Sequence, residues 1–118
     1  MTKRILVVDD ERSIADSLAT ILRQSGYSAE ACYNAASALS QCENTAPDLV
    51  ISDVVMPGID GVEMAIRIKQ HYPNCKVLLF SGMAATADLL EQARRQGYEF
   101  EVLQKPVHPS DLLSRLVA

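Results

Sequence analysis

The sequence has no apolar run of about 18 residues, the length that a membrane-spanning helix needs. Near its start, the apolar stretch at residues 5–8 is short and is followed by two acidic residues, unlike the longer apolar core of a signal peptide. We therefore expect a cytoplasmic protein whose partners do not include a membrane.

Cysteine pairs and positive charge are also scarce. The three cysteines, Cys32, Cys42 and Cys75, are odd in number and form no Cys-x-x-Cys pair, which favours reduced thiols packed as small hydrophobic side chains. Acidic residues outnumber basic ones, 15 to 11, and the net charge is −4. This balance argues against nucleic acid as a direct partner, because phosphate backbones attract basic surfaces. It is compatible with a cation-binding site.

Linkers, repeats and low-complexity tracts are absent as well, so the 118 residues are expected to form one domain. Short apolar runs alternate with segments of helical periodicity, which is typical of a parallel sheet with helices on both faces. The predicted strands are residues 5–8, 28–32, 49–51, 77–80 and 99–104. The predicted helices lie near residues 14–22, 35–43, 62–69, 89–93 and 112–116, with Ser110 as the N-cap of the last.

Polar side chains gather where four of the five predicted strands end. They are Asp9 and Asp10 after the first strand, Asp53 after the third, Ser81 after the fourth and Lys105 after the fifth. Since ligands of such folds bind beyond the carboxyl ends of the strands, these side chains are expected to converge. Carboxylates that meet repel one another unless a cation joins them, and Mg²⁺ or Mn²⁺ suits oxygen ligands.

The same cluster suits phosphoryl transfer. A carboxylate such as Asp53 can act as the nucleophile that forms an aspartyl phosphate. The transferred group carries negative charge on three oxygens, which a metal ion and the Lys105 ammonium can offset. The Ser81 hydroxyl can donate a hydrogen bond to one of those oxygens.

The chain resembles the receiver domains of response regulators in two-component signalling. The motifs that carry the resemblance are Ile-Leu-Val-Val-Asp-Asp at residues 5–10, Asp-Val-Val-Met-Pro-Gly-Ile-Asp-Gly at residues 53–61, Ser81-Gly82 and Lys105-Pro106. The resemblance covers essentially the whole chain and implies that residues 1–118 form one receiver domain. The implied fold is the α/β, doubly wound, flavodoxin-like one of the chemotaxis regulator, with five helices and a five-stranded parallel sheet in the order 2-1-3-4-5.

Site roles follow from the resemblance. It implies that Asp53 accepts the phosphoryl group, and that Asp9, Asp10, Asp53 and the backbone carbonyl of Val55 hold Mg²⁺ or Mn²⁺. Ser81 and Lys105 would bind the phosphoryl oxygens, and the Lys105-Pro106 peptide would be cis.

The resemblance also implies partners. The phosphoryl donor would be a histidine kinase or a histidine phosphotransfer protein. Phosphorylation would switch the face built from the fourth and fifth strand–helix units, which would then engage an output domain, a partner protein or a second copy. Such a domain is a phosphoacceptor switch rather than an enzyme, and at most it catalyses its own phosphorylation and dephosphorylation.

Two departures from the family pattern affect output. The family usually has an aromatic residue three positions before the lysine of the fifth strand, where this sequence has Val102; Phe100 is expected on the same face of that strand. The last predicted helix is also shorter than usual, which suggests a receiver belonging to a longer protein with an output domain.

Three alternatives remain open from the residues. A pseudo-receiver, a protein-interaction module that is never phosphorylated, is favoured by Val102 and opposed by the complete set of acids. A haloacid-dehalogenase-like phosphatase needs an acid two residues after the nucleophile, where Val55 stands. A flavin-binding module needs a phosphate-binding loop after the first strand, where Asp9-Asp10-Glu11 would repel phosphate.

Overall fold

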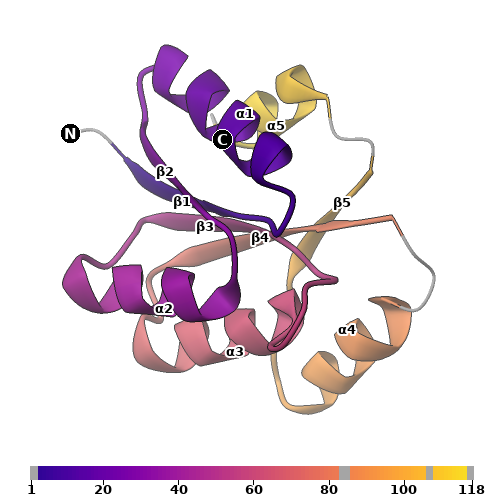
Figure 1. Ribbon diagram of the computed structural model, residues 1–118. Helices are drawn as coiled ribbons and strands as arrows, with labels where there is room; N and C mark the ends of the chain where they lie inside the picture. The colour runs from indigo at the N-terminus through magenta and orange to yellow at the C-terminus, as the bar shows by residue number, and fades with distance from the viewer. Residues whose placement is uncertain (1–2, 83–85, 106–107, 117–118) are drawn as a thin grey trace.

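The computed structural model describes residues 3–82, 86–105 and 108–116, which form five parallel strands and five helices. The sheet has the order β2-β1-β3-β4-β5, as the resemblance implies. Helices α1 and α5 cover one face, and α2, α3 and α4 cover the other (Figure 1). The elements are β1 (Arg4–Val8), α1 (Arg12–Gln24), β2 (Ser28–Cys32), α2 (Ala35–Asn44), β3 (Leu49–Asp53), α3 (Gly61–His71), β4 (Lys76–Ser81), α4 (Thr86–Arg95), β5 (Glu101–Gln104) and α5 (Pro109–Leu116).

The central strands are apolar on both faces because helices cover both. Along β1, Ile5 and Val7 pack in the layer beneath α1 and α5, whereas Leu6 and Val8 pack in the layer beneath α2 and α3. This alternation is the period-two pattern of a strand whose two faces are both buried. Every residue of β3 is buried.

The parallel register brings the carboxyl ends of the central strands together. In β1 and β3, Val8 is paired with Ser52, and in β3 and β4, Asp53 is paired with Phe80. Residues that follow these pairs therefore emerge at one edge of the sheet, between the two helical layers (Figure 1). That edge is where the sequence places its acids.

Helix ends follow local side-chain chemistry in α2 and α3. The Asn34 side chain accepts a hydrogen bond from the Ser37 backbone N–H, and the Asp60 side chain accepts one from the Glu63 N–H. Each satisfies a backbone donor that the first turn leaves unpaired. Gly26 follows α1 with a φ of +99°, a conformation that glycine adopts without strain.

Two predicted boundaries are wrong. Helix α5 begins at Pro109, so Ser110 lies inside the helix and is not its N-cap. The backbone carbonyl of His108 accepts hydrogen bonds from the N–H groups of Asp111 and Leu112, and proline suits the first turn because it has no N–H to leave unpaired. Strand β5 begins at Glu101 rather than at residue 99, since pairing with β4 starts there.

The cysteines are free and buried, as predicted. Burial raises the pKa of each thiol, and that of Cys75 reaches about 11. These thiols therefore remain protonated and unreactive at neutral pH. None of the helices formed by the described residues is long and apolar enough to cross a membrane.

Candidate functional site

Three acids converge at the carboxyl edge of the sheet. Among the described residues, Asp9, Asp10 and Asp53 each offer a carboxylate oxygen, and these oxygens lie within 4.8 Å of one another. Asp9 and Asp10 follow β1, and Asp53 ends β3, so adjacent parallel strands deliver them. The predicted convergence of the acids is confirmed.

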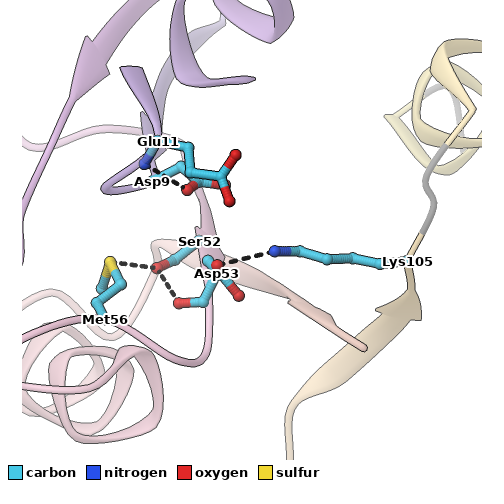
Figure 2. A network of polar contacts seen from close by, with 6 residues as sticks. All are labelled: Asp9, Glu11, Ser52, Asp53, Met56 and Lys105. Atoms are coloured by element: carbon cyan, nitrogen blue, oxygen red, sulfur yellow. Dashed lines mark hydrogen bonds and ion pairs between the residues drawn. The ribbon is translucent and has the colours of Figure 1, made fainter. Parts of the chain in front are cut away.

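Lys105 reaches the same site from the end of β5, the outermost strand of the sheet on that side. Its Nζ lies 2.8 Å from Oδ2 of Asp53, although 52 residues separate the two in the chain. Figure 2 shows the lysine side chain extended toward Asp53 from the end of β5. Partial burial lowers the pKa of Lys105, but its hydrogen bond to Asp53 and the negative charges of Asp53 and Asp9 outweigh that effect and raise it overall. The ammonium therefore stays charged at neutral pH.

Asp9 is the most deeply buried of the three acids. Only 1% of its surface is exposed, and its Oδ1 accepts a hydrogen bond of 2.9 Å from the Glu11 N–H. Its Oδ2 is buried without a hydrogen-bond partner in the described part of the chain. Burial raises the pKa of Asp9, the hydrogen bond from Glu11 lowers it, and the charge of Asp53 raises it further. A buried carboxylate oxygen left in this way is costly unless a cation approaches it.

The donor set fits a hard divalent cation. Asp9 and Asp53 are buried while Asp10 is exposed, so the cluster is open on one side. Mg²⁺ is commonly held by one or two carboxylates and keeps several water ligands, which such an open side accommodates. The unpartnered Oδ2 of Asp9 is the oxygen that most needs this cation.

The loop after β3 is held tightly against the site. The Val54 N–H donates to the Phe80 carbonyl at 3.1 Å, and the Gly61 N–H donates to the Val54 carbonyl at 2.8 Å. Gly61 is the first residue of α3, and its backbone lies directly against that of Asp53.

Sequence reasoning missed Ser52. It is fully buried beside Asp53, and its hydroxyl donates to the Asp53 carbonyl at 2.8 Å. The available signal was a hydroxyl in a strand that is otherwise apolar before Asp53.

Ser81 ends β4 beside Lys105. Its backbone carbonyl accepts a hydrogen bond of 2.9 Å from the Lys105 N–H, which sets the two residues next to each other. The side chain of Val55 is 51% exposed, while the neighbouring Val54 and Met56 are buried. The predicted cis Lys105-Pro106 peptide involves a residue outside the described ones.

A hollow lies beside Val102, where the family usually has an aromatic residue. The cavity has a volume of about 500 Å³ and is lined by residues of α4 and by the ends of β4 and β5. Val102, Tyr98 and Phe100 all pack against the layer beneath α3 and α4. Phe100 therefore lies on the same side of the sheet as Val102, but it precedes β5 and is not in the strand as predicted. The rings of Tyr98 and Phe100 stack on each other with centroids 6.3 Å apart. They precede β5 and are not among the residues that line the cavity.

Comparison with known proteins agrees with this geometry. The family model of the response regulator receiver domain matches residues 5–117. The chain belongs to the response regulator receiver family.

Relatives of this receiver domain differ in length. It is 32% identical over 114 residues to the response regulator receiver protein CpdR of Brucella abortus (strain 2308), with 97% of this chain and 93% of that protein covered. It is 34% identical over 121 residues to the alkaline phosphatase synthesis transcriptional regulatory protein PhoP of Bacillus subtilis (strain 168), covering 100% of this chain but 48% of that protein. The receiver domain thus spans about half the length of several curated relatives that it matches.

Solved structures share the fold. A CheY-like response regulator receiver domain protein from Methanospirillum hungatei JF-1 superposes with a TM-score of 0.90 at 31% identity, over 99% of this chain and 92% of that one. The flavodoxin-like, CheY-like topology is therefore confirmed. Domains of this family are signalling switches rather than conventional enzymes.

Proposed function

We propose that this receiver domain takes a phosphoryl group on Asp53 from the phosphohistidine of a histidine kinase or a histidine phosphotransfer protein, with Mg²⁺ or Mn²⁺ bound. The observation that carries the proposal is the meeting of three carboxylates, one with an unpartnered buried oxygen, at the residue that Lys105 contacts. Structural packing alone gives no reason to gather these acids, because their mutual repulsion destabilises the fold.

The cation would be held by the carboxylates of Asp9, Asp10 and Asp53 and by the backbone carbonyl of Val55. When bound, it supplies positive charge that offsets the carboxylates and the oxygens of the incoming group. The hydrogen bond from the Glu11 N–H to Oδ1 fixes the orientation of the Asp9 carboxylate, and Oδ2, which has no partner among the described residues, would be the oxygen offered to the cation.

The transfer itself exchanges one bond for another. A carboxylate oxygen of Asp53 attacks the phosphorus, the bond from phosphorus to the histidine nitrogen breaks, and that nitrogen keeps the electron pair. Lys105, charged and already in contact with Asp53, pairs with a phosphoryl oxygen as negative charge spreads over the group. The Ser81 hydroxyl donates a hydrogen bond to another oxygen.

The output would lie on the face formed by α4, β5 and α5. Ser81 ends β4, which borders this face, and Lys105 directly follows β5, which belongs to it, so movement of either toward the phosphoryl group would shift the contacts of the face. The partner would be an output domain, a separate protein or a second copy of the chain. The proposal places residues 1–118 in one cytoplasmic receiver domain that contacts no nucleic acid itself. Because Val102 has no ring to rotate, the coupling would not use the rotation of an aromatic side chain at this position.

Incubation with Mg²⁺ and acetyl phosphate, followed by intact mass measurement, tests the proposal. The wild type should gain one phosphoryl group and Asp53→Asn should gain none, whereas Asp88→Asn, which alters an exposed acid of α4, should behave as wild type. Modification of Asp53→Asn, or modification unaffected by chelation of Mg²⁺, would refute it. No modification of the wild type would leave the pseudo-receiver as the better description.

A further inference from the structure

Ser52 stands out as a polar group in an apolar layer. By the alternation of β3, its side chain points to the same face as Val50 and Val54, which belong to the core beneath α2 and α3. Ser52 has no exposed surface. A hydroxyl in such surroundings is destabilising unless it forms a hydrogen bond.

The Ser52 hydroxyl forms its hydrogen bond with Asp53, the proposed phosphoacceptor. The Ser52 Oγ lies 2.8 Å from the carbonyl oxygen of Asp53 and 4.0 Å from the Sδ of Met56 (Figure 2). A hydroxyl has one proton, and a thioether is a weak acceptor, so the Asp53 carbonyl accepts the hydrogen bond and the Met56 sulfur only packs against the hydroxyl. Ser52 therefore contacts the acceptor residue and the loop three residues beyond it.

The peptide between Asp53 and Val54 is held from two elements, and the peptide that follows it is held from a third. The Ser52 hydroxyl of β3 donates to its carbonyl oxygen, and its N–H, that of Val54, donates to Phe80 of β4 at 3.1 Å. The next carbonyl, that of Val54, accepts from Gly61 of α3 at 2.8 Å. Two of these bonds are between backbone groups, so the bond from Ser52 is the one that the choice of side chain controls.

The orientation of this peptide sets the course of the loop. Val54 and Met56 point inward and are buried, whereas the side chain of Val55 between them is 51% exposed. Residue 55 follows the fixed peptide directly, and its carbonyl is the backbone ligand in the proposed metal site. A rotation of the peptide would carry both that carbonyl and the backbone of Asp53 away from Asp9.

We infer that Ser52 is a positioning residue whose buried hydroxyl fixes the Asp53–Val54 peptide and thereby sets the affinity of the site for a divalent cation. This inference deepens the proposed function and depends on it. Ser52 touches neither the phosphoryl group nor the cation in this arrangement and acts through the backbone of Asp53.

The test measures Mg²⁺ binding to the unphosphorylated protein by calorimetric titration. Ser52→Ala removes the hydroxyl and should weaken Mg²⁺ binding by about five- to tenfold, the effect expected from losing one buried hydrogen bond. Ser52→Thr keeps the hydroxyl and should bind within about twofold of wild type. The matched control is Val50→Ala, on the same strand and face, which should lower stability to urea while leaving Mg²⁺ affinity unchanged.

The outcomes separate the two ideas. If the wild type binds no Mg²⁺, the proposed function fails. If the wild type binds Mg²⁺ and Ser52→Ala binds it equally well, or Val50→Ala weakens binding as much, the positioning role is refuted. Should Ser52→Ala fail to fold, Ser52→Cys replaces it, since it keeps the volume but is a weak donor. Wild-type affinity in that variant would overturn the inference.

Discussion

Replacing Gly61 by alanine should damage the site and the fold together. A Cβ at this position would lie 2.2 Å from the carbonyl oxygen of Asp53 and 3.0 Å from both the Asp53 carbonyl carbon and the Val54 Cα. All three are backbone atoms, so no side-chain rotation relieves the contact. An ordinary Cβ contact is 3.4–4 Å, so α3 must move by at least about 1 Å from the end of β3.

The magnitude follows from that displacement. Forcing a group into a packed interior costs about 1–3 kcal/mol, so the free energy of unfolding should fall by about that amount. The same movement displaces the carboxylate of Asp53, and a misplacement of about 1 Å can slow a positioned reaction by about a hundredfold. Urea unfolding measures the first effect, and the initial rate of modification by acetyl phosphate with Mg²⁺ measures the second.

Gly82→Ala is the matched control. It is a glycine beside the same site, but its Cβ would meet only the Lys105 side chain, with a nearest distance of 3.4 Å. It should change stability by less than about 0.5 kcal/mol. Wild-type stability and wild-type rate of modification by acetyl phosphate in Gly61→Ala would show that α3 and β3 adjust without cost, which contradicts the steric reasoning.

Four further predictions concern side chains around the site. Lys105→Met should lower the free energy of unfolding in urea by at most about 1 kcal/mol, because its ion pair with Asp53 is partly exposed. It should nevertheless slow modification by acetyl phosphate about a hundredfold. The control is Lys76→Met, which removes an exposed lysine of β4. Since the pKa of Lys105 is raised, the stability that the Lys105–Asp53 ion pair contributes is complete at neutral pH and is lost only above pH 10.5. Loss of this contribution at a lower pH would contradict the raised pKa. Asp9→Asn should make the metal-free protein more stable than the wild type at neutral pH, because the raised pKa of Asp9 means that its ionisation opposes folding. In thermal unfolding, the stability difference between the variant and the wild type should disappear as the pH falls below 3.8. A difference that persists below that pH would show that the charge of Asp9 is not its cause. Thr86→Val should raise the free energy of unfolding by about 1 kcal/mol, since the buried hydroxyl of Thr86 has no hydrogen-bond partner within the described ranges. A variant less stable than the wild type would contradict this explanation.

The fold was readable from the sequence because its signals are local. Residues 5–8 and 49–51 are continuous apolar runs, which a strand covered on both faces requires, and the amphipathic segments between them predict the covering helices. The positions of the acids, of Ser81 and of Lys105 at strand ends then predicted one site. The parallel order of the strands turns those separate positions into a cluster.

Local signals were weaker at two element boundaries. The sequence predicts a strand from residue 99, but pairing with β4 begins at Glu101, so the neighbouring strand decides where β5 starts. Ser110 is a good N-cap residue by type, yet α5 already begins at Pro109, whose missing N–H suits the first turn of a helix.

The sequence by itself determined the chemistry available to this protein: which acids, which amine and which hydroxyl stand at the ends of which strands. Only the tertiary structure decided the distances between them. The 2.8 Å contact of Lys105 with Asp53, the unpartnered oxygen of Asp9, the bond from Ser52 and the lack of space at Gly61 all depend on strand register and helix packing. Periodicity encodes which face a residue occupies, but contacts between segments far apart in the chain are set by how whole elements pack.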